Sequence, residues 1–190
     1  EGVSQAVVQV SAPRRVEECA PVSTREDGSF TLHALVTDVG AEALDIRWND
    51  IYTITVPAQL RGLFWANQRL AYDLLLKTAW QTIDRFTHRD SHLRGRSGAH
   101  AVLHTHERNL DYHPHVHLIV PAGAINMRSM QWRQRKKKEK VLFWAANLSR
   151  VFRAKWLAAM RLARLHCEET LPDAWVVHCK KVGRGQQALV

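Results

Sequence analysis

The stretch HPHVHLIVPAG, residues 113–123, decides the fold that we expect for this chain. Its histidines alternate with other residues and lead into an apolar run, which is the pattern of a β-strand with one buried face. A second alternating stretch, AHAVLHTHE at residues 99–107, precedes it across a turn around RNLDY. The two stretches predict a β-hairpin that holds six of the eleven histidines of the chain.

Strand-like and helical patterns on either side of this hairpin complete a fold. Residues 43–57, ALDIRWNDIYTITVP, alternate like a strand that ends at proline, and residues 59–86 carry apolar side chains at helical spacing. After the hairpin come a basic connector at 127–140, a second helical pattern at 141–166 and a last strand in PDAWVVHCKKVG. The order βαββαβ predicts an α+β protein with a ferredoxin-like (RRM-like) antiparallel sheet and helices packed on one face.

Composition and charge bound the domain organisation and the partners. With 190 residues, 46% of them hydrophobic, the chain is long enough for one domain with a core. Residues 1–44 hold three basic and seven acidic residues, whereas the rest of the chain holds 24 basic and 11 acidic residues. We therefore expect residues 1–44 to be an N-terminal segment without an assigned role, and residues 45–190 to be a domain that binds a polyanion.

The sequence also bears on the compartment. It has no apolar run close to the roughly 20 residues of a membrane span, and we expect no signal peptide. Because the first residue is Glu1, we expect a fragment or a processed chain. The cysteines Cys19, Cys167 and Cys179 are widely spaced without a CxxC pair, which argues against a disulfide framework and favours a reducing cytoplasm as the location of the protein. We expect no membrane partner.

The histidine hairpin has the residue types and the spacing of a metal site. Residues two apart on a strand point the same way, about 6.5 to 7 Å apart, so the imidazoles of His115 and His117 can converge on one ion. A third ligand must come from the neighbouring strand. Without that ligand, the same imidazoles would only line a polar groove.

The register of the hairpin decides which residue is the third ligand, because a slip of one residue exchanges the two faces of a strand. Pairing residue 106 with residue 113 places His104 opposite His115, and pairing 107 with 113 brings Glu107 to the metal face instead. The sequence leaves the third ligand open among His104, His106 and Glu107. We expect His104, His115 and His117 as ligands, and we expect the residues that support them to be His106, Glu107 and His113.

The run LHTHERNLDYHPHVHLIVPAG resembles the histidine-hydrophobe-histidine (HUH) core of rolling-circle transposases, the two-tyrosine class of certain bacterial insertion sequences and common-region elements. The HUH triplet is His115, Val116 and His117. Upstream, TITVPAQLR and QRLAYDLLLKTAWQTI resemble other segments of the family, as do NLSRVFRAKWLAAMR and WVVHCKKVGRG downstream. The resemblance covers residues 46–190 and implies that the HUH strand lies in the middle of the sheet.

The resemblance implies an activity, a cofactor and a partner. Such a transposase (an HUH endonuclease) cleaves single-stranded DNA at the ends of a mobile element. A tyrosine hydroxyl attacks the phosphodiester to form a 5′-phosphotyrosine link, and the 3′-hydroxyl that is released serves in strand transfer. A Mg²⁺ or Mn²⁺ ion polarises and positions the phosphate. We accordingly expect a role in DNA transposition and recombination, at the nucleoid in the bacterial cytoplasm.

The sequence departs from the family pattern in its tyrosines. The family places two tyrosines, one helical turn apart, on a helix after the stretch that reads WVVHCKKVGRGQQAL here, and this sequence ends at Val190. The tyrosines Tyr52, Tyr72 and Tyr112 lie in other elements. We therefore expect no catalytic nucleophile in this chain and place it beyond Val190, so that the activity of the chain by itself stays open. The cysteine-rich zinc region of the family also has no counterpart in residues 1–44.

Basic residues of the second helix and the last strand predict a DNA surface. At 100° per residue, four arginines of that helix fall within about 80° of one another, opposite an apolar face. Such a stripe would contact phosphates without reading sequence, although it could also face solvent alone. The expected DNA-binding residues are Arg150, Arg153, Arg161, Arg164, Lys180, Lys181 and Arg184.

Two other functions stay open. HPHVHLIV also fits the histidine-triad pattern of nucleotide hydrolases and transferases, in which alternating histidines include the nucleophile. Against that function, Pro114 is unusual in a central strand, and a small nucleotide does not require the arginine stripe. The other possibility is a non-catalytic DNA-binding module that retains the fold. The DNA sequence recognised and the oligomeric state are not predicted.

Overall fold

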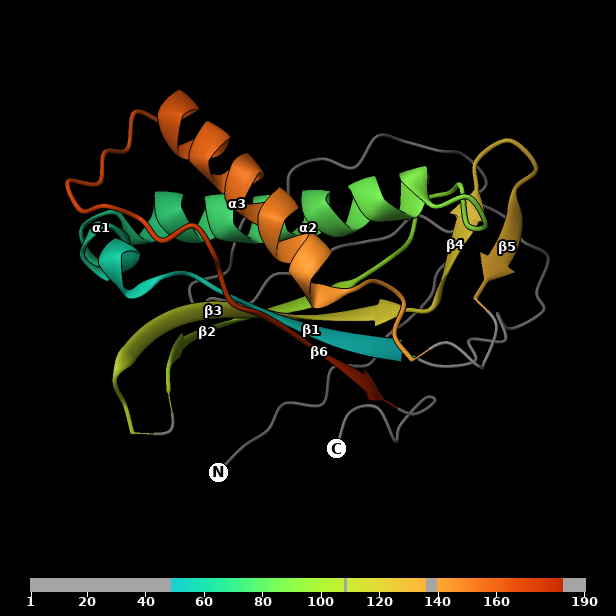
Figure 1. Ribbon diagram of the computed structural model, residues 1–190, viewed down its shortest axis with the longest axis horizontal. Coiled ribbons are helices and arrows are strands. Elements are labelled where there is room, and N and C mark those ends of the chain that lie inside the picture. Colours follow the sequence, from blue (N-terminus) through green and yellow to red (C-terminus); the bar gives the residue numbers. More distant parts are fainter. Residues whose placement is uncertain (1–48, 108, 136–139, 183–190) are drawn as a thin grey trace.

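Four antiparallel strands form the main sheet of the computed structural model, which describes residues 49–107, 109–135 and 140–182. They lie in the order β2 (His100–His106), β3 (Tyr112–Pro121), β1 (Asn49–Thr55) and β6 (Val177–Val182). The HUH strand β3 is therefore central, and the ferredoxin-like order is confirmed (Figure 1). The predicted N-terminal segment 1–44 lies outside the described residues.

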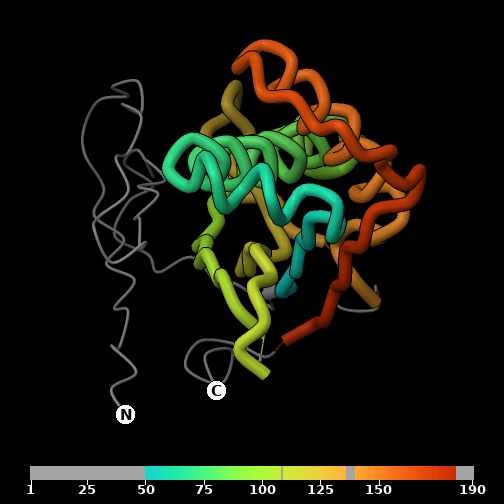
Figure 2. The backbone as a smooth tube through the Cα atoms, turned by 90° about the vertical axis from the view of Figure 1, so that its left-hand side faces the viewer, coloured from blue at the N-terminus to red at the C-terminus, as the bar shows by residue number. Residues whose placement is uncertain are grey.

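The helices cover one face of this sheet. After the turn η1 (Ala58–Leu60) come α1 (Arg61–Ala66) and α2 (Gln68–Arg89), and α3 (Ala145–Leu162) connects the later strands. Figure 2 shows α2 and α3 on the same side of the strands. The single helix expected at 59–86 is broken at Asn67, whose backbone has φ −134° and ψ 41°. Within the described ranges, no helix combines the length and the apolar character needed to cross a membrane.

Alternation along the central strands produces the core. Tyr52 and Ile54 of β1 are fully buried toward the helices, as are Val116 and Leu118 of β3. The helices supply apolar stripes at helical spacing, and burying each large side chain contributes about 1.5 to 3 kcal/mol. The fully buried helical members include Leu75, Ala79, Ile83, Leu148, Phe152 and Trp156. The core thus takes the even-numbered residues of β1 and β3 and leaves their odd-numbered residues on the opposite face.

Helix α3 starts later than the sequence predicts, and two backbone groups before it bond to the sheet. The N–H of Leu142 donates to the buried carboxylate of Asp50, and the N–H of Phe143 donates to the hydroxyl of Tyr52 at 2.9 Å. The helix begins at Ala145 rather than at residue 141, and these bonds tie the segment before it to β1. We refer to these four residues as the Asp50 anchor.

The connector expected at 127–140 contains structure that the sequence did not indicate. Strands β4 (Gly123–Asn126) and β5 (Gln131–Gln134) pair as a second antiparallel sheet. The side-chain oxygen of Asn126 accepts the N–H groups of Arg128 and Ser129, at 3.0 and 3.1 Å, which closes the turn between the strands. The expectation of a connector without strands was therefore wrong at Gln131–Gln134. Residues 136–139 of the connector lie outside the described residues.

Candidate metal centre

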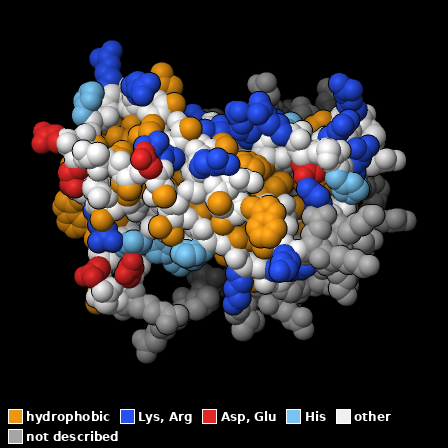
Figure 3. Space-filling view, viewed as in Figure 1, with side chains coloured by type: hydrophobic (Ala, Val, Ile, Leu, Met, Phe, Trp, Pro, Cys, Tyr) orange, Lys and Arg blue, Asp and Glu red, His pale blue; other side chains and the backbone are white. Residues whose placement is uncertain are grey.

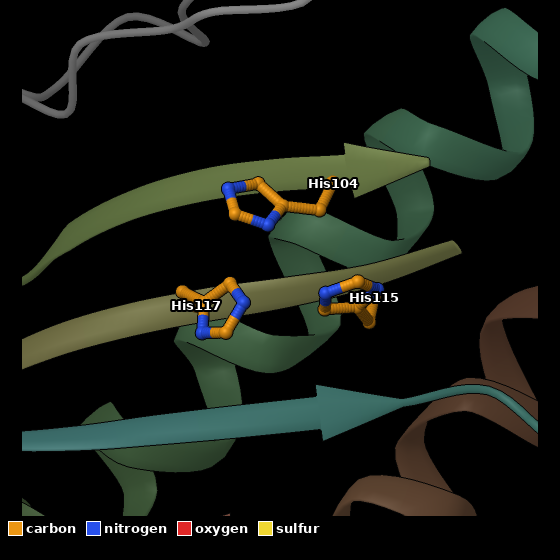
Figure 4. Close-up of side chains that lie close together, drawn as sticks. All are labelled: His104, His115 and His117. Atoms are coloured by element: carbon orange, nitrogen blue, oxygen red, sulfur yellow. The ribbon is translucent and has the colours of Figure 1, made fainter. Parts of the chain in front are cut away.

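Three imidazoles converge on the face of the sheet that the helices leave open. His104 comes from β2, and His115 and His117 come from the adjacent β3 (Figure 4). One nitrogen from each ring can be chosen so that all three atoms lie within 4.8 Å of one another, and the trio could hold a metal ion. The ring centroids are 4.5 to 5.2 Å apart. Helices lie behind the strands in this view, and the rings lie in front of them.

The hairpin register selects His104 as the third residue. His104 pairs with His115, which is one of the two registers that the sequence leaves open. Beyond this pair the register shifts, so that His106 pairs with Tyr112 and one extra residue lies in β3. Pro114 falls within this bulge and also beyond the last β1–β3 pair, so neither neighbouring strand needs an N–H from it. The proline therefore fits a central strand at this one point.

Hydrogen bonds at Nδ1 orient two of the rings. His115 Nδ1 donates to the backbone carbonyl of His113 at 2.7 Å, so Nε2 of His115 keeps its lone pair. His117 Nδ1 lies 3.0 Å from the hydroxyl of Thr53 on β1, which can accept the Nδ1 proton in the same way. Such bonds fix the tautomer and the ring orientation of metal-binding histidines. Of the three histidines of β3, His115 and His117 can thus offer Nε2.

Burial favours the neutral, ligand-competent form of two of these histidines. Desolvation lowers the pKa of His117 to about 4, with His104 and His115 adding to the effect. Desolvation also lowers the pKa of His104, and His115 adds to it. A neutral imidazole has the free lone pair that a metal requires. These two rings are therefore ready to bind without first losing a proton at neutral pH.

This pKa shift predicts how the stability of the metal-free chain depends on pH. The folded chain keeps His117 neutral down to pH about 4, whereas the unfolded chain protonates it near 6.5. The unfolded state binds more protons between these values, so the free energy of unfolding should fall as the pH drops from about 6.5 to about 4. Urea unfolding at several pH values measures this, and His117→Asn should flatten the profile. Equal losses in both proteins would contradict the shift.

The three expected supporting residues lie at the end of the hairpin. His113 Nδ1 lies 3.0 Å from a carboxylate oxygen of Glu107 and also contacts the guanidinium of Arg61. Desolvation lowers the pKa of His113, Glu107 opposes this, and Arg61 and His115 add to it. His106 contacts the hydroxyl of Thr105 at 2.9 Å. None of the three belongs to the trio, but His113 contacts His115 both through its carbonyl and through its ring, with centroids 5.6 Å apart.

The predicted DNA-binding arginines of α3 lie on the opposite side of the sheet from the trio. Figure 3 shows Lys and Arg side chains over the helix layer and histidines at the lower left, over the sheet. Arg153 is engaged by the carbonyl of Pro172 at 3.1 Å and the carboxylate of Asp173 at 3.3 Å. Arg150 and Arg161 are exposed, and Arg150 also donates to Asn147 at 3.1 Å. Arg164 is exposed too, but it follows the end of α3 at Leu162 with φ 55°, so its place in the helical stripe was predicted wrongly.

The predicted basic residues of the last strand fall on different faces. Lys180 pairs with Ile51, which shares a face with Thr53, so Lys180 is on the side of the histidines. Lys181 pairs with Asp50 and is on the helix side. Arg184 lies outside the described residues. One lysine of the predicted set is therefore placed on the same face as the trio.

Several residues near the trio were not singled out from the sequence. Thr53 and Arg61 contact His117 and His113, and His178 pairs with Thr53 on the open face. Arg61 is the first residue of α1 and follows Pro-Ala-Gln-Leu in the sequence. Its basic side chain soon after β1 was the feature of the sequence that could have marked it as a site residue. The buried Nε of Arg61 has no hydrogen-bond partner among the described residues.

None of the three tyrosines presents a free hydroxyl to the trio. Tyr52 is fully buried in the Asp50 anchor, where desolvation, followed by the charge of Asp50, raises its pKa. The hydroxyls of Tyr72 and Tyr112 bond to each other at 2.8 Å, and desolvation raises the pKa of Tyr112, to which Tyr72 adds. All three hydroxyls therefore have structural partners within the domain.

Comparisons with known proteins agree with the histidine motif. Residues 98–190 match the family model Y2_Tnp, described as "Putative transposase". The chain is 33% identical over 95 residues to "Putative transposase y4qJ" of Sinorhizobium fredii (strain NBRC 101917 / NGR234), a match that covers 50% of this chain. The chain spans only 24% of the length of that relative.

Among solved structures, the conjugative relaxase TrwC in complex with mutant OriT DNA is similar to this chain, with a TM-score of 0.47 and 16% identity. The similarity covers 71% of this chain and 50% of the relaxase chain. The family match contains both histidine strands, β2 and β3. Residues 98–190, just under half of the chain, thus match the Y2_Tnp model of transposases, in agreement with the expected HUH-type transposase family.

Proposed function

We propose that residues 45–190 are the metal- and DNA-binding core of a transposase that cleaves and transfers single-stranded DNA at the ends of a mobile element. The observation that carries the proposal is the convergence of His104, His115 and His117 on an open sheet face in a chain that matches a transposase family model. An open face can admit a polymer, whereas a closed pocket would suit a small nucleotide better.

The donor set is suited to one of the two expected ions more than to the other. The trio offers three imidazole nitrogens and no carboxylate. Mg²⁺ prefers oxygen ligands, whereas divalent transition metals accept imidazole, so we propose that Mn²⁺ binds more tightly than Mg²⁺. When bound, such an ion supplies Lewis-acid polarisation of a phosphate oxygen and helps to orient the phosphodiester.

The remaining roles are assigned to residues of the chain. The three histidines hold the ion, and Thr53 and the carbonyl of His113 hold two of their rings in place. Lys180 lies on the same face and is proposed to contact a DNA phosphate. Arg150, Arg161 and Arg164, with Lys181, would bind phosphates of flanking DNA on the helix side. Arg153 would do so only if it released Asp173.

The proposed cleavage uses a tyrosine from outside residues 1–190. Its hydroxyl oxygen forms a new bond to phosphorus, the bond from phosphorus to the 3′ oxygen breaks, and the leaving oxygen takes up a proton. The hydrogen bonds of Tyr52, Tyr72 and Tyr112 support this assignment. The same hydrogen bonds are also consistent with the second candidate function, a DNA-binding module without catalytic activity.

One assay separates these functions. The purified chain is mixed with a single-stranded oligonucleotide, with and without Mn²⁺, over a series of salt concentrations. A parallel sample contains an adenosine nucleotide. We expect salt-sensitive DNA binding that Mn²⁺ strengthens, with no covalent adduct on a denaturing gel. Nucleotide hydrolysis without DNA affinity would refute the proposal in favour of a histidine-triad enzyme.

A second sample distinguishes the transposase core from a non-catalytic module. The polypeptide is continued beyond Val190 into the region where the tyrosine helix is expected, and the same oligonucleotide is added. An adduct that requires Mn²⁺ supports the transposase. DNA binding without an adduct in the extended polypeptide would favour the module.

A further inference from the structure

Trp65, at the end of α1, exposes an unusually large apolar surface. This residue is 64% exposed, although tryptophan is highly buried on average in proteins. The indole packs edge-on against the ring of Tyr112, with centroids 5.1 Å apart and an interplanar angle of 85°. One part of the indole is therefore supported by the protein, and much of the rest faces solvent.

The support beneath Trp65 is itself fixed. The hydroxyl of Tyr112 bonds to the hydroxyl of Tyr72 on α2 at 2.8 Å, and its ring also packs against His106 at 5.8 Å. Tyr112 is thus held by α2, by β2 and by its own strand. A rigid aromatic ring loses little conformational entropy when a ligand stacks on it, which favours binding at this position.

Trp65 lies at the same end of the molecule as the histidines. Tyr112 starts β3 and is three residues from His115, which corresponds to about 10 Å along a strand. Helix α1 also carries Arg61, which contacts His113, and Figure 1 shows α1 above the start of β3. Trp65 is on the helix side of the sheet and the trio is on the other face, and the contact of Arg61 with His113 joins the two sides at this end. A strand that leaves the trio around this end of the sheet would therefore meet the indole.

We propose that Trp65 stacks on an unpaired base of the DNA strand whose phosphate is bound at the histidine trio. The proposal rests on the proposed function, because it takes the ligand to be single-stranded DNA. Unpaired bases expose their faces to aromatic side chains, whereas bases inside a duplex are already stacked. Stacking accepts any base, so this contact would position the strand beside the trio without reading its sequence.

Trp144 provides a matched control. It is 66% exposed, like Trp65, and it directly precedes α3. That position follows the Asp50 anchor, and Asp50 pairs with Val120 near the end of β3, whereas Trp65 packs on Tyr112 at the start of β3. Replacing Trp144 removes an equally exposed indole from the other end of this strand.

The test measures single-stranded DNA affinity in the presence of Mn²⁺ for the wild-type chain and for Trp65→Leu, Trp65→Phe and Trp144→Leu. Trp65→Leu should weaken binding by about 5- to 150-fold, Trp65→Phe should restore most of it, and Trp144→Leu should stay within about twofold of wild type. Mn²⁺ affinity without DNA should be the same in all four proteins, and so should the circular dichroism spectra.

Oligonucleotides with a single abasic position identify the stacked base. One abasic position should weaken wild-type binding but leave Trp65→Leu unaffected, because the contact is already lost there. If wild type binds and Trp65→Leu binds equally well, the stacking proposal is wrong and the proposed function stands. If wild type itself fails to bind single-stranded DNA, the proposed function fails, and the stacking proposal fails with it.

Discussion

Replacing His115 and His117 together by alanine is expected to abolish Mn²⁺ binding while the chain stays folded. The double change removes two of the three nitrogens that lie within 4.8 Å of one another. Loss of a residue that merely orients a metal ligand costs about 10- to 100-fold in affinity, so loss of two ligands should cost more than about 100-fold. Calorimetric titration with Mn²⁺ measures the change directly.

Two further variants on the same face test this result, one as a control and one as an intermediate case. His178→Ala removes an exposed imidazole that pairs with Thr53 but lies outside the trio, and it should leave the affinity unchanged. Thr53→Val removes the hydroxyl next to His117 Nδ1 and should cost about 10- to 100-fold. A metal titration of the double mutant that matches wild type would refute the ligand assignment.

The second large effect is expected at Asp50, which is fully buried beneath the start of α3. Asp50→Ala leaves the N–H of Leu142 without its acceptor, deprives the hydroxyl of Tyr52 of a bond of 3.2 Å, and opens a small cavity. Together these losses should lower the free energy of unfolding by about 2 to 4 kcal/mol. Urea denaturation would show a lower midpoint with an unchanged slope.

Asp50→Asn and Asp173→Ala test the cause of this destabilisation. Asparagine keeps an oxygen acceptor and removes a charge whose burial raises the pKa of Asp50, so it should cost less than alanine. Asp173 is fully exposed and makes a surface ion pair with Arg153, which is worth about 1 kcal/mol or less. An Asp50→Ala protein as stable as wild type would show that the anchor does not hold α3.

The sequence predicted most of the fold because alternation and helical spacing are local signals. The order of the elements along the chain and the apolar face of each helix follow from these patterns, whereas the central position of β3 was implied by the family resemblance. The bonds of the segment before α3 to Asp50 and Tyr52 join residues more than 90 positions apart in the chain, which local patterns do not predict. The β4–β5 hairpin was missed because its strands are four residues each and its second strand is polar.

The candidate site was predictable in its residues but not in its register. The spacing of His115 and His117 on one strand was sufficient to pair them. The choice between His104 and Glu107 depended on one residue of register, which the sequence left open. Contacts between elements were not predictable either, and the ion pair of Arg153 with Asp173 and the contact of Arg61 with His113 are of that kind.

The bulge at Pro114 allows the tip of the hairpin to change in length without moving the histidine trio. The pair of His104 and His115 is held by the register of β3 against both β2 and β1, and the bulge separates that pair from the tip. One residue more or fewer between His106 and Tyr112 would alter only the tip. The same change between His115 and His117 would turn one imidazole to the helix side. We expect related chains to vary in length at the tip and to keep the spacing within β3.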